Sequence, residues 1–209
     1  MIIFDYNQVA ISNLMEQIGS SKVSVDETLV RHMILNTIRT YVKKYKDSHG
    51  PEVIIACDNR HYWRREIFPH YKAGRKKARD SSGHDWPSIF DCLGKIKQEL
   101  KDSSPYKVID VDTCEADDII AVLAMKFAAT QKVMILSSDK DFAQLQKFPN
   151  VEQYSPILKK NIKEPLPAAQ LKQLIIRGDK SDGIPNILSK DDTFVEGVRQ
   201  KPITEAKII

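Results

Sequence analysis

The sequence predicts an α/β fold with a mostly parallel central sheet flanked by helices. Short apolar runs alternate with helical patterns along most of the chain, and the runs are apolar on both faces. Continuous apolar strands separated by helical crossovers are typical of a parallel sheet that is covered on both sides. The strands are expected at residues 2–4, 53–57, 107–111, 133–136 and 151–154.

The N-terminal elements follow from residue spacing. Ile2–Phe4 is an apolar run, and residues 28–44 carry apolar side chains at the spacing of a helix face. Gly50-Pro51 predicts a turn before the strand Val53–Cys57.

Four further helices are expected at residues 86–100, 118–129, 141–146 and 168–177. The proline- and lysine-containing stretch 156–167 is interpreted as a connector, and residues 178–182 as a turn. The segment from Ile187 to Ile209 has too few apolar residues for a core of its own.

Composition excludes several classes of protein. The chain has 209 residues, of which 42% are apolar and 29% charged, as in ordinary globular proteins. No apolar run is long enough to span a membrane, and the N-terminus does not resemble a secretory signal. The three cysteines are scattered without C-x-x-C spacing, which argues against a disulfide framework or zinc ribbon. We therefore expect a soluble protein of a reducing, cytoplasmic compartment.

Basic residues gather in one segment. Residues 60–79 hold eight Lys or Arg residues and one acid, a formal charge of +7, whereas the whole chain carries +4. A basic stretch on a slightly acidic body indicates a face that binds a polyanion, and a solvated charged loop is the alternative.

Acidic residues gather where predicted strands end. Asp5 and Asp58 directly follow strands, and Asp139 follows a third strand after two serines. The carboxyl ends of parallel strands meet at one edge of a sheet, which is where ligands of such folds bind. Other acids are expected nearby, namely Asp141 and the helix-opening residues Glu115, Asp117 and Asp118. Oxygen ligands without His or Cys favour Mg²⁺ or Mn²⁺, and two such ions could hold a phosphodiester for hydrolysis.

Each acidic group also has a structural interpretation. Asp112 and Glu115 could form a capping box, with the next two acids favouring the helix dipole. Asp139 and Asp141 could form a turn that caps the next helix. Asp5 and Asp58 are harder to explain in this way, because desolvating an unpaired carboxylate is costly.

Six motifs in order make the chain resemble the flap endonuclease and 5′-nuclease family. They are Ala56-Cys57-Asp58-Asn59, Tyr62-Trp63-Arg64-Arg65, Tyr71-Lys72-Ala73-Gly74-Arg75, Glu115-Ala116-Asp117-Asp118, Ser137-Ser138-Asp139-Lys140-Asp141-Phe142 and Gly178-Asp179-Lys180-Ser181-Asp182-Gly183-Ile184-Pro185. The resemblance extends from Phe4 to about Ile187 and implies a nuclease core over residues 1–160. It also implies a helical arch at about 60–88 and a partial helix–three-turn–helix module over 165–209, with its C-terminal part missing.

The resemblance implies roles for individual residues. Asp5, Asp58, Glu115 and Asp117 or Asp118 would form the first metal site together with Asp139, and Asp141, Asp179 and Asp182 would serve a second ion. Tyr71, Lys72 and Arg75 would contact the scissile phosphate at the foot of the arch. Further nucleic-acid contacts are expected from Arg64, Arg65, Lys76, Lys77, Arg79 and Lys180. A monovalent cation such as K⁺ belongs to the duplex-binding module, where this chain departs from the family pattern after Asp182.

The function that the resemblance implies is a Mg²⁺-dependent 5′→3′ exonuclease and flap endonuclease acting on RNA–DNA and DNA duplexes. We expect a monomer that removes RNA primers during replication, with a single-strand-binding protein and a polymerase clamp as partners. In a phage-encoded protein the compartment would be the host cytoplasm. The alternatives are a catalytically impaired DNA-binding fragment and a single-strand ribonuclease of the PIN type. A haloacid-dehalogenase-type phosphatase is disfavoured, because the first strand is followed by Asp5-Tyr6-Asn7 rather than Asp-x-Asp.

Overall fold

The structure, a computed structural model, describes residues 1–19 and 24–204. The chain forms two compact units, one containing residues 1–61 and 85–165 and the other residues 62–84 and the segment from Leu166 onward. Most of the residues expected to form the arch therefore group with the C-terminal segment, whereas the sequence-based division placed them within the core.

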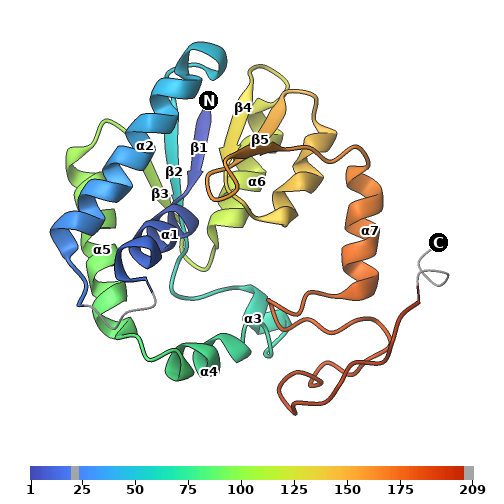
Figure 1. The fold of residues 1–209 in the computed structure, drawn as a ribbon. Helices are drawn as coiled ribbons and strands as arrows, with labels where there is room; N and C mark the ends of the chain where they lie inside the picture. Colours follow the sequence, from blue (N-terminus) through green and yellow to red (C-terminus); the bar gives the residue numbers. More distant parts are fainter. Residues whose placement is uncertain (20–23, 205–209) are drawn as a thin grey trace. The chain divides into compact units, whose positions relative to one another are not determined.

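The first unit is built on a six-stranded sheet with strand order β3-β2-β1-β4-β5-β6 (Figure 1). The strands are β1 (Ile2–Asp5), β2 (Val53–Cys57), β3 (Lys107–Asp110), β4 (Val133–Leu136), β5 (Val151–Ser155) and β6 (Lys160–Ile162). Strands β1 to β5 pair in parallel, and in the register of the sheet Ile3 lies opposite Ile54 and Ile135. The predicted α/β fold with a mostly parallel sheet is confirmed.

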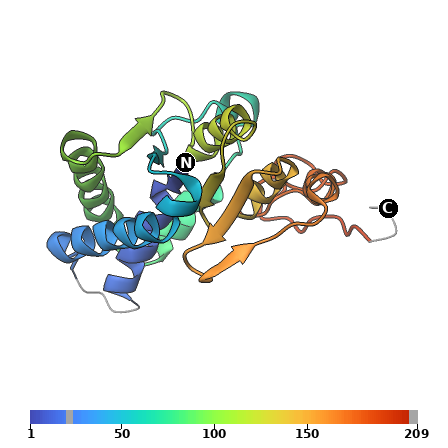
Figure 2. The ribbon, with the colours of Figure 1, turned by 90° about the horizontal axis from the view of Figure 1, so that it is seen from above.

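Strand β6 was not predicted. It pairs antiparallel with β5 at the edge of the sheet, inside the stretch that was expected to be a connector (Figure 2). Its three residues are mostly exposed, so they carry no hydrophobic pattern that would indicate a strand.

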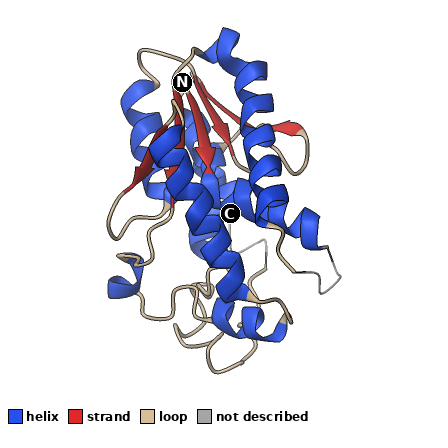
Figure 3. Ribbon diagram, turned by 90° about the vertical axis from the view of Figure 1, so that its left-hand side faces the viewer, coloured by secondary structure: helices blue, strands red, loops and turns tan. Residues whose placement is uncertain are grey.

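Helices cover both faces of this sheet (Figure 3). Alternate strand residues face opposite sides, so Phe4 joins one hydrophobic cluster and Ile3 the other. The first cluster packs against α1 (Tyr6–Ile18), α2 (Glu27–His49) and α5 (Trp86–Ser103), and the second against α6 (Ala116–Phe127) and the 3₁₀ helix η1 (Lys140–Lys147).

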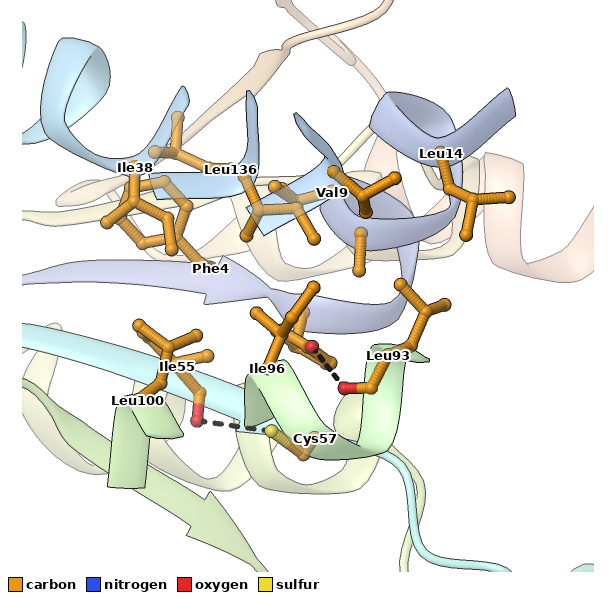
Figure 4. Close-up of a cluster of buried hydrophobic side chains, with 14 of the residues drawn as sticks. Phe4, Val9, Leu14, Ile38, Ile55, Cys57, Leu93, Ile96, Leu100 and Leu136 are labelled. Atoms are coloured by element: carbon orange, nitrogen blue, oxygen red, sulfur yellow. Dashed lines mark hydrogen bonds between the residues drawn. The ribbon is translucent and has the colours of Figure 1, made fainter. Parts of the chain in front are cut away.

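The first cluster fixes the start of α1 (Figure 4). Tyr6, the first residue of α1, is buried and its hydroxyl donates a hydrogen bond of 2.6 Å to the carbonyl oxygen of Leu93 on α5. Burial of each large aliphatic side chain contributes about 1.5–3 kcal/mol. The end of β1 is thus held in a well-packed interior.

Helix α1 was not predicted. Its buried residues Val9, Leu14 and Ile18 are separated by polar ones, and the amide of Asn13 bonds to the carbonyl of Val9. The other main helices begin within two residues of the expected positions, and α2 continues to His49. Trp86 opens α5 and lies with its ring centroid 5.5 Å from that of Phe90.

Among its residues up to 204, the second unit contains the helices α3 (Arg64–Ile67), α4 (Gly74–Ser81) and α7 (Pro167–Arg177). Helix α4 has no buried residue, so its basic side chains contribute charge to the surface rather than to a core. Among the residues that the structure describes, no helix is long and apolar enough to cross a membrane.

Candidate active site

Asp5 ends β1 and begins α1. Its side chain is 7% exposed; one carboxyl oxygen accepts from the backbone N–H of Gln8 (3.1 Å) and the other from the Ser137 hydroxyl (3.0 Å). Burial, reinforced by the charges of Asp58 and Asp139, raises the pKa of Asp5 to about 7, although the two hydrogen bonds favour the carboxylate. Asp5, Asp58 and Asp139 therefore lie close enough at this edge for their charges to interact.

Asp58 follows β2 and connects it to two helices. Its Oδ1 accepts from the N–H of Ala116 at the start of α6 (2.7 Å), and its Oδ2 accepts from the amide of Asn7 in α1 (2.6 Å). The carboxylate is held in one orientation by donors from both sides of the sheet edge.

Glu115 and Asp118 form the capping box at the start of α6. The side chain of Glu115 accepts from the backbone of Asp118, whose own carboxylate accepts from the N–H of Glu115 at 2.9 Å. The alternative with Asp112 as the N-cap was wrong, because α6 begins at Ala116, three residues later than that box requires. Glu115 is 1% exposed, and Asp117 lies in the first turn.

Asp139 caps η1, so the capping interpretation of this acid is confirmed. Its Oδ1 accepts from the N–H of Asp141 (2.9 Å), and its own N–H donates to the hydroxyl of Ser137 (3.1 Å). Ser137 thus bridges the two acids, since its hydroxyl also donates to Asp5.

The donors at this edge suit a hard divalent cation. The groups that act on Asp5 are two carboxylates, a hydroxyl and a backbone N–H, and the two carboxylates, whose charges help to raise the pKa of Asp5, are those that a cation would neutralise. Over residues 1–19 and 24–204, no three Asp, Glu, His or Cys side chains are grouped as a ready-made metal site. A metal site formed by the acids at this edge stays a prediction.

The second unit brings together the predicted phosphate-contacting residues around Asp182. The carboxylate of Asp182 lies 2.7 Å from the guanidinium of Arg75 and 3.7 Å from the ammonium of Lys72, and it accepts from the hydroxyl of Tyr71 at 3.1 Å. Lys72 is 8% exposed, has a φ of +55°, and donates its backbone N–H to the carbonyl of Asp182 at 2.8 Å. Asp182 therefore partners the basic residues of its own unit.

Asp179 shapes a tight turn in the same unit. Its Oδ1 accepts from the backbone N–H (2.8 Å) and the hydroxyl (2.5 Å) of Ser181, and its backbone forms a bridge with Ile184. Gly178 has a φ of +68°, and a Cβ there would lie 2.4 Å from the carbonyl oxygens of Ile184 and Pro185. Glycine is thus required for this turn. A shared ion for Asp141, Asp179 and Asp182 stays a prediction.

The remaining predicted nucleic-acid contacts are also in the second unit. The guanidinium of Arg64 lies 4.8 Å from the ring centre of Trp63, and that of Arg65 lies 5.2 Å from that of Tyr62. Arg65, Lys76, Lys77 and Lys180 are exposed, and Arg79 is partly buried. These positions suit contacts with a phosphate backbone.

Supporting residues at the acidic edge were missed by the sequence analysis. Asn7 donates to the carboxylate of Asp58, and Gln8 accepts from the backbone N–H of Ser138 in the turn after β4. Ser137 and Gln153 bond to the backbone of Asp139. Gln153 carries the one available signal, a polar residue at a buried position of a strand.

Most of the chain is similar to known nucleases. Residues 12–174 match the 5′–3′ exonuclease N-terminal resolvase-like domain. Over 205 residues the chain is 40% identical to ribonuclease H of Enterobacteria phage T4, covering 94% of this chain and 67% of that protein. It is also 35% identical over 131 residues to the flap endonuclease Xni of Colwellia psychrerythraea, covering 60% of this chain and 42% of that protein.

Solved structures show the same fold. The 5′-exonuclease of phage T5 with bound zinc ions superposes with a TM-score of 0.74 at 16% identity, covering 100% of this chain and 82% of that one. A T5 flap endonuclease in complex with DNA and metal ions also has a TM-score of 0.74, at 17% identity, covering 89% and 69%. The domain match, the identity to the T4 enzyme and the shared fold together show that this chain belongs to the 5′–3′ exonuclease and flap endonuclease family.

Proposed function

We propose that this chain is a Mg²⁺-dependent 5′→3′ nuclease that cuts 5′ flaps and removes short products from RNA–DNA and DNA duplexes. The observation that carries the proposal is the acidic edge, where Asp5 is buried beside Asp58 and Asp139 and shares Ser137 with Asp139. Ionised carboxylates at such an edge repel one another, and a bound divalent cation would neutralise that repulsion.

The carboxylates of the first unit would hold the cations. When bound, Mg²⁺ supplies positive charge to the phosphodiester and lowers the pKa of the attacking water. Asp58 is already fixed by Ala116 and Asn7, and Asp139 by Asp141 and Ser137, so little side-chain ordering is left to accompany binding. Mn²⁺ is expected to substitute for Mg²⁺, because it prefers the same oxygen ligands.

The basic residues of the second unit would bind phosphate. Lys72 and Arg75 both pair with the carboxylate of Asp182, and a bound phosphate would take the place of that carboxylate as their negative partner. Tyr71 would add a hydroxyl donor. Cations placed in advance can neutralise charge that grows on the phosphate during cleavage. A K⁺ ion near the Gly178–Pro185 turn is part of the same proposal.

The biological setting is inferred from the relatives and from chemistry. Removal of RNA primers during replication fits a relative called ribonuclease H. The free cysteines Cys57, Cys92 and Cys114 fit a reducing cytoplasm, that of the host for a phage protein. We infer a monomer that works with a single-strand-binding protein and a polymerase clamp.

Cleavage and binding assays on the same substrates test the proposal. Purified protein is incubated with 5′-labelled flap and nicked duplexes in Mg²⁺ or in EDTA, and flap affinity is measured separately. Short labelled products are expected in Mg²⁺ alone. Asp139→Asn should abolish cleavage while flap affinity stays within a few-fold, because binding by cations of the second unit does not need this carboxylate.

Asp112→Asn is the matched control, because Asp112 is an exposed acid near the same edge whose carboxylate bonds only locally, to the N–H of Thr113. It should cleave as the unaltered protein does. Products in EDTA, or normal turnover by Asp139→Asn, would contradict the metal assignment. Tight flap binding without any cleavage by the unaltered protein would instead support a DNA-binding role.

A further inference from the structure

We propose that Gln153 is a positioning residue, which holds the turn after β4 so that Asp139 can bind a divalent cation. This inference rests on the proposed function. Gln153 lies on β5 and is not one of the acids, but its side-chain amide bonds to the backbone of the turn that carries Asp139.

The hydrogen bonds of Gln153 define its role. Its amide nitrogen donates to the backbone carbonyl of Ser137 at 3.0 Å and to that of Asp139 at 2.7 Å. Both partners are acceptors, so the amide must face them with its NH₂ group, and the orientation of the side chain is fixed by chemistry. One side chain therefore holds the carbonyls on both sides of Ser138.

The burial of Gln153 indicates why a glutamine is present. The residue is 1% exposed, and Val151, two positions away on the same face of β5, is buried and apolar, so an aliphatic side chain at position 153 would also suit this face. A buried amide costs about 1–3 kcal/mol unless its hydrogen bonds are made. A polar side chain at such a position fixes the positions of its hydrogen-bond partners rather than adding hydrophobic stability.

Other contacts complete the support of this turn. The N–H of Ser138 donates to the side-chain oxygen of Gln8, and the hydroxyls of Ser138 and Ser155 lie 2.5 Å apart. Gln153 bonds to the backbone carbonyl of Asp139, whose N–H bonds to the hydroxyl of Ser137. Loss of its amide would leave two buried carbonyls without this donor and let the Asp139 backbone shift.

Metal affinity is the measurement that separates positioning from simple packing. Gln153→Met keeps the length of the side chain but removes both donors, and partners that orient a metal ligand are typically worth about 10–100-fold in metal affinity. We expect Mn²⁺ binding, followed by electron paramagnetic resonance, to weaken about 10-fold or more. The Mg²⁺ concentration for half-maximal cleavage should rise in parallel, with turnover largely recovered at saturating Mg²⁺.

Two variants control for loss of a hydrogen-bonded, partly buried amide elsewhere in the unit. Gln146→Met removes the donor to the oxygen of Gln153 (3.4 Å) but leaves the two carbonyl contacts intact. Asn150→Ala removes an amide bond of 2.8 Å to the carbonyl of Ala128, elsewhere in the unit. Both should lose stability while keeping Mn²⁺ affinity within about twofold.

Hydrogen exchange gives a readout that needs no metal. The N–H of Asp139 is protected by the hydroxyl of Ser137, so its exchange in EDTA should accelerate at least tenfold in Gln153→Met and stay unchanged in both controls. If Gln153→Met fails to fold, Gln153→Leu serves instead, because it also removes both donors and places no charge in the buried site.

The possible failures are distinguishable. Unaltered protein that neither binds Mn²⁺ nor cleaves would overturn the proposed function and this inference with it. The inference alone would be overturned if the unaltered protein binds Mn²⁺ and the Gln153 variant binds it as tightly as the two controls do. In that case hydrogen exchange at Asp139 would also be normal in the Gln153 variant.

Discussion

Replacement of Asp5 by Asn should stabilise the metal-free protein while it destroys activity. The carboxyl of Asp5 is buried and its pKa is raised to about 7, from about 3.9 in an unfolded chain. Each pKa unit corresponds to about 1.4 kcal/mol, so the ionised form costs on the order of 4 kcal/mol of folding free energy above neutral pH. Asn avoids this cost because it carries no charge.

The structure indicates that Asn fits in place of the carboxyl group. Its side-chain oxygen can still accept from the N–H of Gln8 and so cap α1, and its amide can donate to the hydroxyl oxygen of Ser137. Asn is as good an N-cap as Asp, so the start of the helix loses nothing. The substitution therefore changes charge with little change in shape.

The sign of the pH dependence follows from proton binding. Between about pH 4 and pH 7 folded Asp5 keeps a proton that the unfolded chain has released, so the stability contributed by this group falls as the pH rises. The difference in unfolding free energy between the two proteins should change by about 1.4 kcal/mol per pH unit in this window. It should then be constant above about pH 8, with Asp5→Asn the more stable.

Urea unfolding in EDTA at pH 4, 5, 6, 7 and 8 measures this difference directly. Asp26→Asn is the matched control, because Asp26 caps α2 in the same way but is exposed, so it measures the effect of exchanging a cap without burial. A flat difference for Asp5→Asn, or greater stability of the unaltered protein at pH 8, would refute the reasoning. On the proposed function, Mg²⁺ stabilises the unaltered protein and has little effect on Asp5→Asn.

Three further predictions concern the second unit. Lys72→Ala should lower single-turnover cleavage about a hundredfold or more, the size expected for a preorganised charge, and a change confined to binding would make it a mere phosphate contact. Asp182→Asn should tighten flap binding in EDTA a few-fold, because Asn does not neutralise Lys72 and Arg75. Unchanged affinity would show that the ion pairs with Asp182 do not weaken phosphate binding. Gly178→Ala should lower the unfolding free energy by more than about 1 kcal/mol, since its φ of +68° and two carbonyls at 2.4 Å leave no room for a methyl group. Gly94→Ala in α5 meets nothing within 4 Å and should be stabilising by about 0.5–1 kcal/mol in the same urea titration.

Elements with strong local patterns could be predicted from the sequence. Strands β2 and β4 are uninterrupted apolar runs with the predicted bounds, because both of their faces are buried. The positions of Asp5 at the end of β1 and of Asp58 after β2 followed from the apolar runs before them, since an acid at the end of a buried parallel strand lies at the ligand-binding edge.

Elements that depend on distant partners could not be predicted in this way. Helix α1 draws its stability from the cap by Asp5 and from the packing of Leu14 and Ile18, which its polar residues obscure in the sequence. Strand β6 exists because β5 offers it an edge to pair with. Gln153 acts through carbonyls at positions 137 and 139, and a backbone acceptor leaves no trace in the sequence.

Capping and metal binding, which the sequence posed as alternatives for the acids, are compatible in the structure. An N-cap uses one lone pair of a carboxylate that has about four acceptor sites. Asp139 accepts from Asp141 through Oδ1, and Asp118 accepts from Glu115 through Oδ2. Capping fixes the direction in which a carboxylate points, and a fixed direction is what a metal ligand requires. A helix that begins at the end of a parallel strand therefore supplies both the acid and the backbone N–H that orients it, so evidence that an acid caps a helix does not count against its binding a metal.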